Sequence, residues 1–326
     1  METESEPVRG LVDVDVQPLS ALHERVGERV ELTVGGDPDE DALVDELADM
    51  DVVFTTSRLP ISRRVLEATN LSVVAKFGTG LDNVDVEAAN DHGIPVTHTP
   101  GLNALSVAEH ALGLLLATLR RTVHAQRVLE SGGWRDETPI GRQLSGKTVG
   151  IVGYGRIGQR FATLLDGFHA ETLAFDPYVE QEDAELTGTA MTTLDSLLER
   201  SDAVVITTEL TDETRGMLDE AAFAAMKPSA VVVNVARGAV IDQSALIGAL
   251  RDETIAGAGL DVFESEPLTP DSPLHGFETV TLTPHIAART EEASVACIDR
   301  LATNALALLD GRTVPDRYLA TGSGLR

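Results

Sequence analysis

Residues Lys147 to Gly158 read Lys-Thr-Val-Gly-Ile-Val-Gly-Tyr-Gly-Arg-Ile-Gly, and this stretch decides the fold. The apolar residues before Gly153 predict a buried strand, and Gly153, Gly155 and Gly158 form a complete G-x-G-x-x-G turn. Apolar residues at helical spacing follow the turn. A strand, a glycine turn and a helix N-terminus in this order predict a pyrophosphate site, because the backbone approaches closely and free N–H groups attract negative charge.

A second strand over 172–175 ends at Asp176, eighteen residues after Gly158. An acid at this place accepts hydrogen bonds from the ribose hydroxyls of a dinucleotide and repels a 2′-phosphate. Neither Pro177 nor Tyr178 is basic. The cofactor we expect is therefore NAD, with NADP as the alternative. A glycine-rich turn in some other α/β protein is the simpler interpretation, and the full order of segments disfavours it.

Composition restricts the class of protein. The chain has 326 residues and 43% hydrophobic content, enough for two cores, and a net charge of −28. Abundant acids with few lysines resemble proteins from salt-loving cells, where salt screens the repulsion, although an ordinary acidic protein is the alternative. Such a surface makes nucleic acid a poor partner.

The sequence predicts no metal site, no membrane-spanning segment and no signal for export. Cys297 is the only cysteine, and no His, Asp or Glu cluster has metal-ligand spacing. The N-terminus is acidic and polar, so we expect no signal peptide. The most apolar stretch, 111–119, is too short to cross a bilayer. The sequence predicts a cytoplasmic protein with no membrane partner.

The segment pattern predicts an α/β fold with two Rossmann-like domains. We expect a smaller, flavodoxin-like substrate domain from 1–100 and 286–326, and an NAD-binding domain over 101–285 with a doubly wound parallel sheet. The expected strands are 11–16, 31–34, 51–55, 71–76, 94–96, 203–207, 230–235, 257–261 and 279–283. The expected helices are 41–50, 103–120, 193–200, 219–225, 243–250 and 291–309.

Three polar residues follow strands of the second domain: Arg237, Glu266 and His285. An arginine fork can bind a substrate carboxylate and polarise a carbonyl, a histidine can donate a proton, and a carboxylate can orient the histidine. Singly, each has a simpler interpretation as a cap, a surface acid or a loop residue. Together, after strands of one dinucleotide sheet, they predict reduction of a 2-keto acid.

Further segments match a known family in order and rough spacing. They are Phe-Gly-Thr-Gly-Leu-Asp-Asn-Val-Asp at 77–85, Thr-Pro-Gly-Leu-Asn at 99–103 with Val-Ala-Glu at 107–109, Asn-Val-Ala-Arg-Gly at 234–238, Asp-Val-Phe-Glu-Ser-Glu-Pro at 261–267 and Thr-Pro-His at 283–285. With the glycine motif and Asp176, the chain resembles the D-isomer-specific 2-hydroxyacid dehydrogenase family over nearly its whole length.

The resemblance implies roles for individual residues. Arg237 would bind substrate, Glu266 would be the partner of the histidine, and His285 would be the acid–base. The backbone N–H groups around Gly78, Thr79 and Gly80 would hold the substrate carboxylate. Cofactor contacts are expected from Gly153, Gly155, Arg156, Ile157, Gly158, Asp176, Thr207, Val235, Ala236 and Asp261. A D-configured product is also implied, as is a homodimer built through the cofactor domain, to which the loop of Trp134 could contribute.

The substrate stays open at this stage. Relatives acting on formate carry glutamine where Glu266 stands, so formate is disfavoured. Phosphoglycerate-oxidising relatives often append a regulatory domain, which we do not expect here, and a phosphate needs a basic pocket to which only Arg58 could contribute. A small acid such as glyoxylate, hydroxypyruvate or pyruvate is preferred. The alternatives are 3-phosphoglycerate oxidation, and a non-catalytic protein that senses NAD.

Overall fold

The computed structural model describes residues 7–320, and the chain divides into two compact units. Unit 1 comprises Met1–Asn103 and Thr290–Arg326, and unit 2 comprises Ala104–Arg289. The sequence predicts no signal peptide because the N-terminus is acidic and polar. Residues 1–6 of that N-terminus lie outside the described residues. The assignment of a substrate role and an NAD-binding role to the two units stays a prediction at this point.

Unit 1 contains a six-stranded sheet in the order β13-β5-β4-β3-β1-β2, in which only the β13–β5 pairing is antiparallel. The order of its parallel strands is that of flavodoxin-like folds, as expected. Its strands are β1 (Val8–Asp13), β2 (Val30–Gly35), β3 (Val52–Thr55), β4 (Val73–Lys76), β5 (Val96–Thr97) and β13 (Leu319–Ala320). Its helices are α1 (Leu19–Val26), α2 (Glu40–Leu47), α3 (Arg63–Ala68), α4 (Val86–Asp91) and α12 (Glu291–Leu309).

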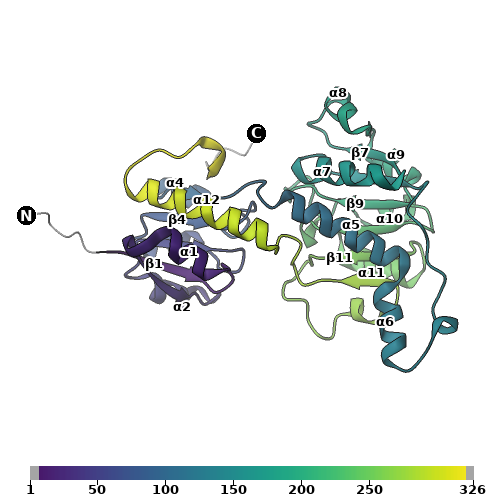
Figure 1. The fold of residues 1–326 in the computed structure, drawn as a ribbon, viewed down its shortest axis with the longest axis horizontal. Helices are drawn as coiled ribbons and strands as arrows, with labels where there is room; N and C mark the ends of the chain where they lie inside the picture. The colour runs from purple at the N-terminus through teal and green to yellow at the C-terminus, as the bar shows by residue number, and fades with distance from the viewer. Residues whose placement is uncertain (1–6, 321–326) are drawn as a thin grey trace, which may run out of the picture. The chain divides into compact units, whose positions relative to one another are not determined.

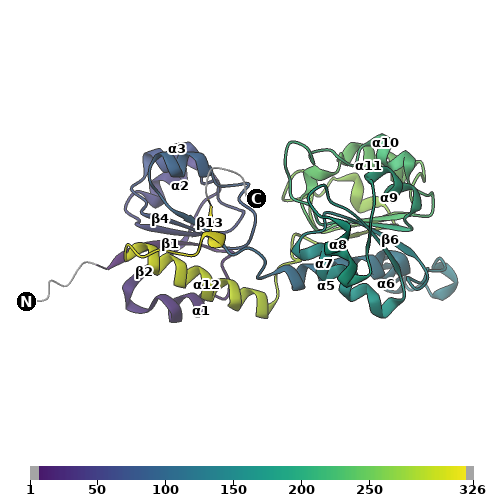
Figure 2. The same cartoon turned by 90° about the horizontal axis from the view of Figure 1, so that it is seen from above.

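Helices cover both faces of this sheet. In Figure 2, α1 and α12 lie on one face and α2 and α3 on the other. Every residue of β3 and β4 is therefore buried, which explains why each strand is apolar up to its last residue, Thr55 or Lys76. The expected strand over 11–16 is wrong at both ends. β1 begins at Val8 and ends at Asp13, where the Val16 amide turns back to the Asp13 carbonyl at 2.9 Å.

Unit 2 contains a fully parallel seven-stranded sheet in the order β12-β11-β10-β9-β6-β7-β8. Its strands are β6 (Thr148–Val152), β7 (Glu171–Phe175), β8 (Ala190–Met191), β9 (Ala203–Ile206), β10 (Val231–Asn234), β11 (Gly257–Leu260) and β12 (Val280–Leu282). Its helices are α5 (Ala104–Arg120), α6 (Thr122–Glu130), α7 (Arg156–Leu165), α8 (Gln181–Ala184), α9 (Leu194–Arg200), α10 (Glu220–Ala225) and α11 (Gln243–Arg251).

The strand order of unit 2 reverses between β6 and β9. The chain runs outward from β6 through β7 to β8, then returns to β9 and runs the other way to β12. Helices α5 and α7 pack on one face, and α9, α10 and α11 on the other (Figures 1 and 2). This confirms the expected doubly wound sheet. In such sheets ligands bind beyond the carboxyl ends of the strands at the reversal.

Candidate active site

The glycine turn lies directly after β6, at the strand reversal. Gly153 has φ +91°, and a Cβ there would lie 2.5 Å from the Cα of Thr208. A Cβ on Gly158 would lie 2.4 Å from the Gly153 carbonyl oxygen, so the first turn of α7 packs directly on the loop. A Cβ on Gly155 would meet nothing within 4 Å. Gly153 and Gly158 thus allow the glycine turn to pack tightly against Thr208 and the first turn of α7. Gly155 leaves open space in front of the N-terminus of α7.

Three further residues expected to contact the cofactor adjoin the glycine turn. The hydroxyl of Thr207 donates to the Gly153 carbonyl at 2.6 Å and so ties the end of β9 to the glycine loop. Arg156 and Ile157 begin α7, Arg156 exposed and Ile157 half-buried. This cradle of open backbone and a helix N-terminus fits a dinucleotide pyrophosphate.

Asp176 follows β7 and is held in place from both sides. Its Oδ2 accepts the amide of Tyr154 at 2.8 Å, and its Oδ1 accepts the amide of Tyr178 at 3.0 Å. Each carboxylate oxygen has a further lone pair available for a ribose hydroxyl. The two amides therefore fix a negative charge beside the glycine turn.

His285 and Glu266 form a close pair in the loops that follow β12 and β11. Nδ1 of His285 lies 2.7 Å from Oε2 of Glu266, and Oε1 of Glu266 accepts the amide of Phe263 at 3.0 Å. Since an ionised carboxylate only accepts, Nδ1 carries the proton in this pair. Nε2 is then the ring nitrogen that can exchange a proton with a bound molecule.

Charge around Glu266 keeps it ionised. Burial by itself raises the pKa of Glu266, but the hydrogen bond and charge of His285, the Phe263 amide and the charge of Arg237 together hold that pKa below its ordinary value. The structure therefore places Arg237 and His285 near enough to Glu266 for their charges to lower its pKa. Arg237 also donates from Nη1 to the Ala236 carbonyl at 2.8 Å.

The turn that carries Arg237 is set by Asn234 and Gly238, the first and last residues of the Asn-Val-Ala-Arg-Gly segment, to which the sequence analysis gave no role of their own. Asn234, which is buried, accepts the Ala236 amide at 3.0 Å and donates to the Arg237 carbonyl at 2.9 Å. A Cβ on Gly238 would lie 1.8 Å from the carbonyl carbon of Phe263. The backbone after Arg237 thus rests directly on the loop that leads to Glu266. The signals available for Asn234 were its place in that segment and its polar side chain at the end of an apolar strand. Val235 and Ala236 are buried in the same turn.

Asp261 is fully buried at the end of β11, where its carboxylate accepts three hydrogen bonds from the loop after β12. Its Oδ1 accepts the Thr283 hydroxyl at 2.6 Å and the Ile286 amide at 2.9 Å, while Oδ2 accepts the Ala287 amide at 2.9 Å. The carboxylate therefore holds the loop around His285. Its expected contact with the cofactor stays a prediction.

The loop expected to hold the substrate carboxylate lies in unit 1, after β4. Gly78 has φ +100°, and its amide donates to the Thr99 hydroxyl at 2.8 Å. Within residues 7–320, no hydrogen bond joins the amide of Thr79 or of Gly80 to another group. The amides of Thr79 and Gly80, rather than that of Gly78, are thus the ones that can take an anion.

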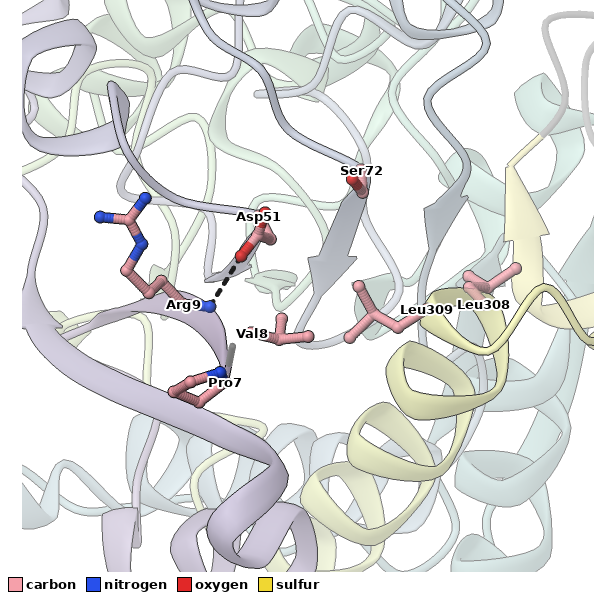
Figure 3. A pocket seen from close by; sticks show the side chains of 7 residues that line it. All are labelled: Pro7, Val8, Arg9, Asp51, Ser72, Leu308 and Leu309. Atoms are coloured by element: carbon pink, nitrogen blue, oxygen red, sulfur yellow. Dashed lines mark hydrogen bonds between the residues drawn. The ribbon is translucent and has the colours of Figure 1, made fainter. Parts of the chain in front are cut away.

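One pocket of unit 1 is lined by none of these residues (Figure 3). It adjoins the starts of β1, β3 and β4, whereas the expected site residues follow strand carboxyl ends. The Arg9 amide donates to Asp51 Oδ2 there at 2.8 Å. Its lining residues are Pro7, Val8, Arg9, Asp51, Ser72, Leu308 and Leu309. Among residues 7–320, no three His, Cys, Asp or Glu side chains are grouped to hold a metal, and no helix is long and apolar enough to cross a membrane.

Comparison with known proteins places these features in a family. Residues 112–287 match the family model described as "D-isomer specific 2-hydroxyacid dehydrogenase, NAD binding domain". The chain is 40% identical over 298 residues to D-3-phosphoglycerate dehydrogenase of Mycobacterium leprae, covering 91% of this chain but 56% of that protein. It therefore spans little more than half the length of that relative.

Two further proteins are covered over most of their length. Glyoxylate reductase of Thermofilum pendens is 40% identical over 286 residues, which cover 85% of this chain and 84% of that protein. The NADPH-dependent glyoxylate/hydroxypyruvate reductase of Sinorhizobium meliloti, solved with NADP and malonate, has a TM-score of 0.83 and 32% identity, covering 98% of this chain and all of that one.

Proposed function

The chain belongs to the D-isomer specific 2-hydroxyacid dehydrogenase family, and we propose that it interconverts a 2-keto acid and a D-2-hydroxy acid with NAD(H). The observation that carries this proposal is the 2.7 Å pair of His285 and Glu266, beside Arg237, at the carboxyl ends of a dinucleotide-binding sheet. A protein that only sensed NAD would not need a proton donor held by a carboxylate.

In reduction, the imidazolium of His285 donates its Nε2 proton to the keto oxygen, while Nδ1 stays hydrogen-bonded to the ionised Glu266. The guanidinium of Arg237 binds the substrate carboxylate and stabilises the negative charge that develops on the keto oxygen. When bound, the nicotinamide cofactor supplies hydride to the carbonyl carbon or accepts it in the reverse direction. In oxidation, His285 takes the hydroxyl proton back. The amides of Thr79 and Gly80 are proposed as additional carboxylate donors.

For the cofactor we propose NAD rather than NADP. The support is Asp176, whose carboxylate is fixed by two backbone amides and would repel a 2′-phosphate. Gly153, Gly155, Gly158 and the start of α7 would hold the pyrophosphate, and Thr207, Val235 and Ala236 would lie along the nicotinamide half.

For the substrate we propose a small 2-keto acid without a phosphate, such as glyoxylate, hydroxypyruvate or pyruvate. Arg58, the one cation expected to favour a phosphate, donates from Nε and Nη2 to Asp13 Oδ1 at 2.8 and 2.7 Å, and from Nη2 to the Gly36 carbonyl at 2.7 Å. Asp15 adds a second carboxylate at 3.8 Å. The guanidinium of Arg58 is thus already bonded within unit 1. The negative charges of Asp13 and Asp15 beside it disfavour a phosphate at this place.

For the assembly we propose a homodimer through the segment from α6 to residue 143. No residue of α6 is buried within the chain, and the apolar side chains of Leu129, Trp134 and Ile140 are 57%, 66% and 98% exposed. Sedimentation in molar KCl tests this: Trp134→Glu should produce monomer. Tyr178→Glu, at an exposed aromatic residue elsewhere, should leave the dimer intact. A cytoplasmic location stays a prediction, which cell fractionation would test.

A steady-state screen tests the proposed function. NADH and NADPH are each combined with glyoxylate, hydroxypyruvate, pyruvate and phosphohydroxypyruvate, in molar KCl because of the acidic composition. We expect NADH-dependent turnover of at least one acid without a phosphate. Tight NADH binding without turnover of any acid would support the sensor alternative instead, and preferred turnover of phosphohydroxypyruvate would contradict the substrate proposal.

A further inference from the structure

Unit 2 contains a histidine that the proposed chemistry does not use. His110 lies in the long helix α5, and its Nε2 is 3.0 Å from the hydroxyl oxygen of Thr283, 173 residues later in the chain. Thr283 is two residues before His285. We infer that His110, acting through Thr283 and Asp261, is a positioning residue that sets the backbone of His285; this inference rests on the proposed function for the acid–base role of His285.

The direction of each hydrogen bond follows from Asp261. Burial raises the pKa of Asp261, but hydrogen bonds from His110, Thr283, Ile286 and Ala287 hold it below its ordinary value, so the carboxylate is ionised and accepts only. The Thr283 hydroxyl must then donate its proton to Asp261 Oδ1. Its oxygen accepts from His110 Nε2, which also lies 3.4 Å from the same Oδ1. His110 therefore carries a proton on Nε2.

Asp261 connects this chain of hydrogen bonds to three consecutive amides. Its backbone carbonyl accepts the His285 amide at 2.8 Å, and its side chain accepts the next two amides along the chain. One buried residue thus fixes the whole turn that carries His285. The remaining side-chain donors to Asp261 are the hydroxyl of Thr283 and the ring of His110, so these two complete the support of the turn.

The turn needs such support because of its backbone conformation. His285 has φ +53°, in the left-handed region that residues with a Cβ rarely adopt. A residue in this region keeps its conformation only where the surroundings impose it. The direction in which the imidazole leaves the backbone depends on this φ. The inference is that loss of the His110 or Thr283 donor lets the turn relax and moves the ring away from Glu266.

Matched pairs of variants separate this role from simple destabilisation. Thr283→Val removes the hydroxyl, whereas Thr283→Ser keeps it. His110→Ala removes the ring, whereas His110→Gln keeps an N–H donor. His275→Ala is the control, because His275 is also a histidine of unit 2, with Nε2 3.2 Å from the Thr269 carbonyl oxygen, and it lies outside both α5 and the turn that carries His285.

Two measurements are made on the 326-residue chain in molar KCl. The first is histidine NMR of the cofactor-free protein, with the His285 ring signal identified by its loss in His285→Gln. The second is steady-state kinetics with NADH binding followed by fluorescence. We expect Thr283→Val and His110→Ala to shift the His285 signal and to lower kcat about 10- to 100-fold with unchanged NADH affinity. The variants Thr283→Ser, His110→Gln and His275→Ala should retain the wild-type signal and most of the turnover.

The two measurements distinguish failure of the inference from failure of the proposed function. An unmoved His285 signal in Thr283→Val and His110→Ala overturns the inference, whatever happens to kcat. A wild-type protein that turns over no keto acid removes the proposed function, while the NMR comparison still decides whether His110 positions His285. Should His110→Ala fail to fold, the Thr283→Val and Thr283→Ser pair gives the answer.

Discussion

His285 and Glu266 are joined by a 2.7 Å hydrogen bond between Nδ1 and Oε2, and the second oxygen of Glu266 is occupied by the Phe263 amide. Glutamine at 266 would have one acceptor oxygen for these two donors. We therefore expect Glu266→Gln to lower kcat for keto acid reduction about 10- to 100-fold, because the ring loses its fixed orientation and its negative partner. Steady-state kinetics measure this. Glu264→Gln, at an exposed neighbour, is the control, and equal effects of the two changes would contradict the assigned role.

Acid should unfold the protein partly through Asp261. Its pKa is lowered in the folded protein, so the unfolded chain binds protons first as the pH falls. The stability from Asp261 is complete above its ordinary pKa of about 4 and is lost as the pH falls through the lowered value. We expect Asp261→Asn to cost about 2 kcal/mol at pH 7 and to flatten the dependence of unfolding free energy on pH below about 5. Denaturant unfolding at several pH values checks this, with the exposed Asp212→Asn as control; parallel curves for wild type and Asp261→Asn would refute it.

Cofactor choice should depend on Asp176. Removal of its carboxylate takes away the acceptor for the ribose hydroxyls and the repulsion of a 2′-phosphate. Asp176→Ala should weaken NADH binding about tenfold and strengthen NADPH binding relative to NADH. Fluorescence titration with both nucleotides measures the two dissociation constants. The same change at the exposed Asp183 should have no effect, and an unchanged preference in Asp176→Ala would show that NAD is selected elsewhere.

A side chain at Gly238 should destabilise the protein, because the backbone there packs closely on the backbone of Phe263. A Cβ on Gly238 would lie 1.8 Å from the Phe263 carbonyl carbon, so the two loops must separate. We expect Gly238→Ala to cost about 3 kcal/mol of unfolding free energy. Gly248→Ala, within α11 where a Cβ meets nothing within 4 Å, should instead stabilise the protein by about 0.5–1 kcal/mol. Thermal unfolding compares them, and a well-tolerated Gly238→Ala would contradict the packing argument.

Much of the architecture was predictable because its signals are local. The strands β3 and β9 are buried on both faces and read as short apolar runs, and α12 has the bounds expected from its helical periodicity. The carboxyl end of β1 was predicted at residue 16, but the strand ends at Asp13. Asp13 is polar, yet it is fully buried and binds Arg58. Periodicity alone cannot reveal an acid that is buried with a partner 45 residues away.

The site was predictable to a smaller extent. Motif order pointed to His285, Glu266 and Arg237, since each follows a strand of one parallel sheet. The supporting contacts depend on tertiary structure: His110 meets Thr283 across 173 residues, and nothing in the sequence of α5 marks that histidine. The backbone conformation of His285 was equally hidden, because a left-handed φ at a non-glycine residue is imposed by its surroundings.

The most direct measurement for the central claim is the first turnover of the NADH complex with its best keto acid, followed by stopped-flow absorbance for wild type and His285→Ala. We predict that His285→Ala slows NADH oxidation about 10²–10⁴-fold while its fluorescence titration with NADH stays unchanged, because only the proton donor is lost. A first turnover in His285→Ala as fast as in the wild type would contradict the assignment of His285 as the acid.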